Sequence, residues 1–347
     1  MDEKITPLLL GFYTQLIGLI PAFCPSVEKT DDGDFTRNRK LPLQRLIVLV
    51  LHLVGGGQHP NGVDIRLGDF FNLSRRGGLW PGAQAPHRSA VSKARAKLAW
   101  GAFEGLFRKA VELAYRVFPP RDEYTWCGLS VIAFDGSKYT LPATPEVREA
   151  FDPDSGLDNP GKGHYPQALV NTAYDVFRRM PVARSVRPIK DGNEREEAGK
   201  LLGQLPPDCV CLFDRGYPSH AFIRELSQQG LLFVMRCPAK STFPAVHTFV
   251  QSGQKEGVIH LMPGGDFQRR PDKQGDGAHP AIKLRIIRLD HPDGTVSVLL
   301  TNLFDRQRFT CAQVVDLYYR RWAVENHYRD EKKASISNGS TAGRSTG

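Results

Sequence analysis

Residues 129–137 read LSVIAFDGS and residues 208–217 read DCVCLFDRGY, two short apolar runs that each lead into an aspartate. Continuous apolar runs such as VIAF and CVCLF are typical of parallel strands that are buried on both faces. Segments of helical character, GNEREEAGKLLGQL and SHAFIRELSQQG, alternate with such strands. Strands followed by helices predict an α/β core.

The two aspartates, Asp135 and Asp214, stand at the carboxyl ends of these predicted strands. Ligands bind at this edge of an α/β sheet. A carboxylate placed there loses solvation unless a positive charge compensates it, and a divalent cation does so well. For either residue alone, capping of the following turn is the simpler interpretation. Two aspartates in the similar settings FDG and FDRG favour a shared cation site.

A third acidic position follows near the end of the chain, where residues 318–333 read YYRRWAVENHYRDEKK. On one continuous helix starting at the N-cap Thr310, four of these residues share a face about 60° wide: Tyr318, Arg321, Glu325 and Lys332. A salt-bridged, solvated helix face is the alternative interpretation. However, an acid flanked by cations suits phosphodiester chemistry, because the acid helps to hold a metal and the cations hold the strand.

Composition points to an anionic partner. The chain has 347 residues and a formal net charge of +9, and residues 35–122 alone carry fifteen Lys and Arg against five Asp and Glu. A basic segment ahead of a balanced one indicates a DNA-binding region, although an ordinary basic protein is the alternative. The six cysteines form no CxxC pair, which disfavours zinc. The apolar run 41–54 is too short and too polar to span a bilayer.

These patterns predict a division of the chain into six segments. They are an N-terminal helix and linker (1–34), an all-helical basic DNA-binding domain (35–122), the first part of the α/β core (123–237), a β-rich insertion without helices (238–309), a C-terminal core helix (310–334) and a disordered tail (335–347). Within the basic domain, residues 91–118 form one long amphipathic helix or two short ones.

Taken together, the motifs resemble the DDE transposases of bacterial insertion sequences, in the family marked by a Tyr-x2-Arg-x3-Glu-x6-Lys motif. The resemblance covers about residues 35–333 and includes RKLPLQRLI, VSKARAKL, AFDGS, YPQA, NEREEAGKLL and FDRGY. It implies a ribonuclease-H-like catalytic core. It further implies that Asp135, Asp214 and Glu325 bind two Mg²⁺ ions, for which Mn²⁺ can substitute, in metal-dependent DNA cleavage and strand transfer.

The resemblance also implies the partners. Double-stranded DNA, as transposon ends and as target, is bound by a homodimer in the bacterial cytoplasm, associated with the nucleoid and not with a membrane. Tyr318, Arg321 and Lys332 are expected to contact phosphates near the cleaved bond. Further DNA contacts are predicted at Arg215 and Arg236, and in the basic domain at Lys93, Arg95 and Lys97.

Two features depart from the family pattern. Some relatives place a tryptophan in the insertion to stack on a displaced base; residues 238–305 contain none, so this role would pass to Phe243 or Phe267 or be absent. The family-like sequence also stops near Ala334 and SISNGSTAGRSTG follows, which suggests a truncation. The alternative function is therefore a truncated, catalytically inactive DNA-binding derivative that acts as an inhibitor or remnant. A cellular nuclease with the same core is a weaker alternative, because it does not require the four-residue motif.

Overall fold

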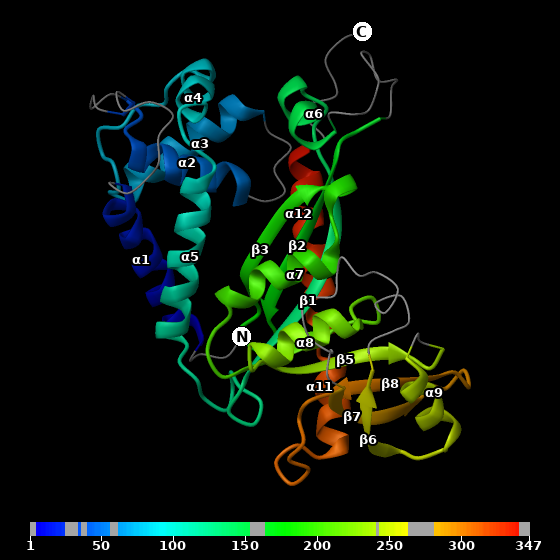
Figure 1. Ribbon diagram of the computed structural model, residues 1–347. Helices are drawn as coiled ribbons and strands as arrows, with labels where there is room; N and C mark the ends of the chain where they lie inside the picture. Colours follow the sequence, from blue (N-terminus) through cyan, green and yellow to red (C-terminus); the bar gives the residue numbers. More distant parts are fainter. Residues whose placement is uncertain are drawn as a thin grey trace. The chain divides into compact units, whose positions relative to one another are not determined.

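The computed structural model describes residues 5–24, 34–35, 40–55, 62–152, 164–240, 243–262 and 281–339, as drawn in Figure 1. The chain divides into two compact units, which are residues 1–119 with 327–347 and residues 120–326. Helix α12 (Trp322–Gly339) begins in the second unit and ends in the first. Within the described residues, no helix has the length and apolar character needed to cross a membrane.

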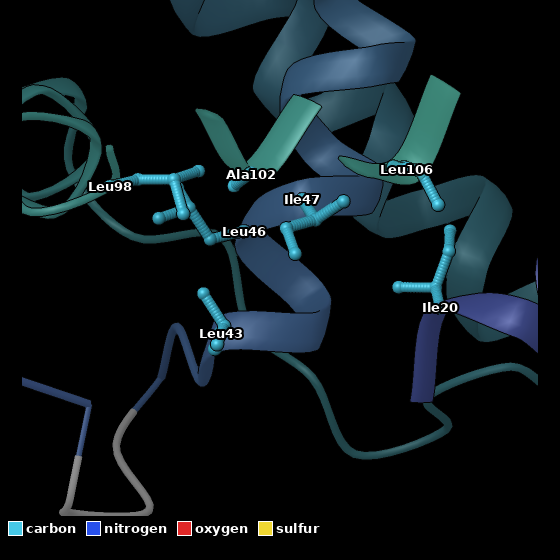
Figure 2. Packing of buried hydrophobic residues seen from close by; sticks show 7 residues of the cluster. All are labelled: Ile20, Leu43, Leu46, Ile47, Leu98, Ala102 and Leu106. Carbon is cyan, nitrogen blue, oxygen red and sulfur yellow. The ribbon is translucent and has the colours of Figure 1, made fainter. Parts of the chain in front are cut away.

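The described part of residues 1–119 forms helices: α1 (Ile5–Phe23), α2 (Leu43–Gly55), α3 (Val63–Arg76), α4 (Arg88–Arg95) and α5 (Gly101–Val117). Figure 2 shows Leu46 and Ile47 of α2 in a core that also takes in Ile20 of α1 and Leu106 of α5. Leu49 of α2 belongs to a second core with Phe70 and Phe71 of α3. Burial in two cores explains why α2 is apolar along nearly its whole length. Of the two alternatives for residues 91–118, the structure has two short helices, α4 and α5.

The unit formed by residues 120–326 is built on one mixed sheet, in which eight strands follow the order β3-β2-β1-β4-β5-β8-β7-β6. The strands are β1 (Ser130–Thr140), β2 (Gln167–Asp175), β3 (Met180–Pro188), β4 (Cys209–Phe213), β5 (Leu232–Pro238), β6 (Glu256–Leu261), β7 (Ile282–Asp290) and β8 (Val296–Thr301). β1, β4 and β5 run parallel, and the remaining neighbours pair antiparallel. The predicted α/β class is confirmed.

Helices α6 (Pro145–Phe151), α7 (Glu194–Leu201), α8 (His220–Gln228), α9 (Pro244–Gln251) and α11 (Cys311–Tyr319) complete this unit with α12. Helices α7, α8 and α11 each begin at a side chain that accepts a hydrogen bond from a backbone amide of the first turn. The accepting residues are Asn193 at α7, Ser219 at α8 and Thr310 at α11. Thr310 forms a capping box with Gln313, which confirms it as an N-cap. Capped starts of this kind set where α7 and α11 begin.

The expectation that residues 238–305 hold only strands is wrong. Helix α9 lies within them and has Pro244 in its first turn. Strands β6 to β8 also extend the core sheet, because β8 pairs antiparallel with β5.

The single helix expected from Thr310 to about Lys333 is also wrong, since it is broken between Tyr319 and Trp322. The amides of Arg320 and Arg321 bond to carbonyls three residues back, as in a tighter 3₁₀ turn. The angles of one continuous helix therefore do not hold across this turn. Helix α12 continues to Gly339, beyond the expected end at 334, and residues 340–347 lie outside the described residues.

Candidate active site

Asp135 and Asp214 lie at neighbouring positions on two parallel strands. The register of β1 and β4 pairs Ala133 with Leu212, and each aspartate stands two residues further along its chain. Adjacent strands are about 4.8 Å apart. The preceding residues, Phe134 and Phe213, are fully buried and stack with ring centroids 4.8 Å apart. Apolar packing thus brings the two carboxyl groups close together. Asp214 directly follows the end of β4, as expected, but the expected strand end at Asp135 is wrong, because β1 continues through Asp135 to Thr140 in its pairing with β2.

The loop after β4 orients Asp214. Its Oδ1 accepts a hydrogen bond of 2.7 Å from the Gly216 amide, and the Gly216 carbonyl accepts one of 3.0 Å from Arg195 Nε. A Cβ atom at position 216 would lie 3.1 Å from Asp214 Oδ1, which is tight. The FDRG sequence therefore builds a turn that holds one carboxylate oxygen in place.

Arg321 brings the third acid to this point. From the turn between α11 and α12, its Nη2 donates a 2.6 Å hydrogen bond to Glu325 Oε1, and its Nη1 lies 3.7 Å from Asp135 Oδ1. Arg321 is only 6% exposed. Within the described residues, its Nε and Nη1 have no hydrogen-bond partner. A buried cation thus bridges the first and third predicted acids.

The pKa of Asp135 reflects the other acidic groups close to its carboxyl. The pKa of Asp135 is raised to about 7, chiefly because its carboxyl is withdrawn from water. Arg321 opposes the rise, and the carboxylates of Glu325, Asp214 and Glu194 add to it. Desolvation also raises the pKa of Glu194, as does the charge of Asp214. Ionised carboxylates are therefore costly here without added positive charge.

Glu194 is the residue that sequence reasoning missed. It lies in the segment NEREEAGKLL, where a glutamate in the first turn of a polar helix is ordinary and does not by itself indicate a site. It stands directly after the N-cap Asn193 of α7. The available signal was its position in the chain, between the two aspartate strands.

Tyr318 is buried, at 4% exposure, so its side chain packs inside the unit in this state of the chain. Burial raises the pKa of its phenol, against the influence of Arg321 and Arg236. Arg236 is itself held by Ser297 Oγ at 3.2 Å and His291 Nε2 at 3.2 Å. The predicted DNA contacts Arg321 and Arg236 thus both act on Tyr318, whereas the predicted contact Arg215 is exposed on the loop after β4.

The remaining predicted contacts lie in the other unit. Lys332 is seven residues beyond Glu325 on α12. Lys93 and Arg95 are exposed on α4, and Lys97 forms an ion pair with the buried carboxylate of Asp34. These cations thus belong to the unit of residues 1–119 and 327–347, and the three acids belong to the unit of residues 120–326.

The alternative stacking residues also differ from expectation. Phe243 is buried, at 6% exposure, so it does not present a free face, and the prediction for it is wrong. Phe267 lies outside the described residues.

As arranged, the described side chains form no group of three acidic, histidine or cysteine residues with the spacing of a metal site. The donor chemistry nevertheless fits a hard divalent cation, because Asp135, Asp214 and Glu325 offer only carboxylate oxygens. The charge also fits, since the guanidinium of Arg321 lies where these acids need a cation. The three residues are thus suited to hold a divalent metal.

Comparison with known proteins places the chain beside transposases. Residues 126–339 match the family described as "Transposase DDE domain". Over 310 residues the chain is 26% identical to the transposase InsG for insertion sequence element IS4 of Escherichia coli (strain K12), covering 86% of this chain and 63% of InsG. The solved piggyBac transposase synaptic complex with hairpin DNA aligns with a TM-score of 0.40 and 11% identity, over 93% of this chain and 67% of that one.

Proposed function

The chain belongs to the family of transposases with a DDE domain, and on that premise we propose that it cleaves and joins DNA strands at the ends of an insertion sequence. The observation that carries the proposal is the gathering of Asp214, Glu325 and Arg321 around Asp135. The chain spans 63% of the length of InsG, whose name makes it the transposase of one insertion sequence. The substrate here, the two ends of such an element, is part of the proposal.

We assign strands β1 to β5 to a ribonuclease-H-like core. The order β3-β2-β1-β4-β5, with β1, β4 and β5 parallel, supports this assignment. In this arrangement β1 carries Asp135, Asp214 directly follows β4, and α12, which comes after the additional strands β6 to β8, carries the third acid. The extension of the sheet therefore separates Asp214 from Glu325 in sequence while the fold keeps Glu325 beside Asp135.

In the proposed reaction, Asp135, Asp214 and Glu325 hold divalent cations, with Mg²⁺ as the expected ion. A bound pair of cations supplies activation of the attacking oxygen and stabilisation of the leaving oxygen. The raised pKa of Asp135 means that its carboxylate forms readily only when positive charge is near. The turn at Asp214 holds one of its oxygens through Gly216, which fixes the direction of the carboxylate.

Cations of the chain hold the DNA in this proposal. Arg321 pairs with Glu325 and Asp135 in the described state, and its two nitrogens without hydrogen-bond partners among the described residues are suited to a phosphate oxygen. Arg236, Tyr318, Arg215 and Lys332 are proposed as further contacts to the backbone. The net charge of +9 supports an anionic partner of this kind.

The proposal is tested by strand cleavage on the element's own ends in Mg²⁺ or Mn²⁺. We expect Asp135→Asn, Asp214→Asn and Glu325→Gln each to lower cleavage by a factor of about 10³ or more, while end binding persists. Asp316→Asn is the matched control, because this exposed acid lies on α11 outside the cluster. Normal cleavage by Glu325→Gln would refute the site. Binding of the ends without any cleavage by the unaltered chain would favour the inactive DNA-binding alternative.

A further inference from the structure

A fourth carboxyl group lies close to two of the three proposed acids, Asp135 and Asp214. Glu194, the first residue of α7, adds to the rise in the pKa of Asp135, and Asp214 acts on Glu194 in the same direction. We propose that Glu194 supplies a fourth carboxylate to the same cation site and thereby strengthens metal binding. The inference rests on the proposed function and adds a fourth metal-binding residue to the three acids.

The fold makes a specific place for this side chain on β1. A Cβ atom at Gly136 would lie 2.7 Å from Glu194 Oε1 and 2.8 Å from its Cδ and Cγ atoms. Such distances are too short for any real Cβ, so the carboxyl of Glu194 lies directly over the Gly136 backbone. Gly136 follows Asp135 in the chain, and its lack of a side chain is what allows the glutamate to approach that acid.

Buried hydrogen bonds fix the backbone of Glu194 in this position. Asn171 is fully buried on β2, opposite Gly136, and its Nδ2 donates a 2.9 Å bond to the Glu194 carbonyl. The Tyr217 hydroxyl, also fully buried, donates to Asn171 Oδ1 at 3.4 Å. A polar network inside the core costs desolvation unless its members are satisfied. Here it joins β2, α7 and the loop of Asp214, and it holds Glu194 against β1 at Gly136, next to Asp135 in the chain.

The buried guanidinium of Arg321 is independent evidence that these acids require positive charge nearby. Arg321 is more than nine-tenths buried and lies among the acids, with Nε and Nη1 lacking hydrogen-bond partners in the described part of the chain. Asp135 is surrounded by one guanidinium, that of Arg321, and by the three carboxyl groups of Glu325, Asp214 and Glu194, so negative charge is in excess. A fourth carboxylate therefore adds to the negative charge that bound divalent cations would neutralise.

The test measures metal binding directly, on the full chain without DNA, by the loss of the free Mn²⁺ signal in electron paramagnetic resonance. We expect Glu194→Gln to weaken Mn²⁺ affinity about tenfold, which corresponds to about 1.4 kcal/mol. Glu196→Gln is the matched control, because it removes the same charge from the same helical turn but bonds to Asn193 instead. Its affinity should stay within about twofold of the unaltered chain. Circular dichroism and thermal melting verify the fold of each variant.

A second variant tests the position of the Glu194 side chain instead of its charge. Gly136→Ala keeps the charge of Glu194 but displaces its side chain, so it should weaken Mn²⁺ binding similarly, and adding Glu194→Gln should have little further effect. Unchanged affinity in Glu194→Gln, together with weakened affinity in Asp135→Asn, overturns this inference and leaves the proposed function intact. Unchanged affinity in Asp135→Asn as well would instead refute the proposed metal site.

Discussion

At the scale of single residues, the protonation of Asp135 links stability to metal binding. Its pKa of about 7 in the folded chain lies far above the ordinary value of 3.8. The unfolded carboxyl therefore ionises first as pH rises, and the folded state binds the extra proton. The contribution is favourable to folding at low pH and is lost between about pH 4 and 7, where the folded carboxyl also ionises.

We therefore expect Asp135→Asn to stabilise the metal-free chain at pH 8, by about 2 kcal/mol or more, because the Asp135 carboxylate, which burial disfavours, is then absent. At pH 4 the same substitution should have little effect. Urea unfolding in a chelator at both pH values measures the difference. A stabilisation of equal size at both pH values would contradict the electrostatic explanation. Added Mg²⁺ should stabilise the unaltered chain more than the variant at pH 8.

The residues proposed for the site differ in how far their sequence setting predicts them. Asp135 and Asp214 follow strongly apolar runs, so their adjacency was predictable. The strand end was predictable at Asp214 only, because β1 continues past Asp135 to Thr140 through its pairing with β2. Glu325 was suggested by its spacing from Arg321, and that i,i+4 pair is present. Glu194 was not predictable, because its role depends on the space above Gly136 and on Asn171 in another strand. Three-dimensional placement, not residue type, distinguishes it from Glu196.

At the scale of elements, the strand that carries Arg285 helps to position the helices of the site. Arg285 is 1% exposed on β7, and its Nη1 donates to the carbonyls of Leu303 at 2.9 Å and Phe309 at 2.7 Å. Its Nε donates to Glu256 of β6 at 2.9 Å. These bonds tie the sheet extension to the segment that leads into α11. They therefore help to set where the turn of Arg321 lies.

Replacement of Arg285 by Met should destabilise the chain by about 3 kcal/mol, because Glu256 and two carbonyls lose a donor in the interior. Arg306→Met is the control, since Arg306 also pairs with Glu256 but its side chain is 55% exposed. Loss of an exposed pair should cost below about 1 kcal/mol. Chemical unfolding of both variants gives the comparison. Similar losses in both would show that the buried bonds of Arg285 contribute little.

Elements were predictable where local pattern decides them. Apolar runs located the strands, and Thr310 located the start of α11. The break between α11 and α12 had no such signal, because residues 319–322 contain no glycine or proline. The pairing of β8 with β5 was also hidden, since strand partners far apart in sequence are chosen by the whole sheet.

At the scale of the whole molecule, charge is distributed unevenly between segments. Residues 35–122 carry a net charge of +10, more than the total of +9, so the rest of the chain is close to neutral. Net charge is additive and was readable from the sequence. Which cations are free to meet DNA was not readable, because Lys97 pairs with the buried Asp34, 63 residues away. Arg108 and Lys109 pair with Glu104 and Glu112 along α5.

We expect the exposed cations of α4 to contribute most to general DNA affinity. The double variant Lys93→Gln with Arg95→Gln should weaken binding of duplex DNA whatever its sequence, and it should lower the slope of log affinity against log salt by about two units. Arg108→Gln with Lys109→Gln removes the same charge from α5, but glutamates already neutralise these side chains. Its salt slope should therefore change by less than about one unit. Fluorescence anisotropy with the full chain between about 50 and 200 mM salt measures both. Equal slopes for the two double variants would show that net charge, and not the placement of α4, determines the affinity.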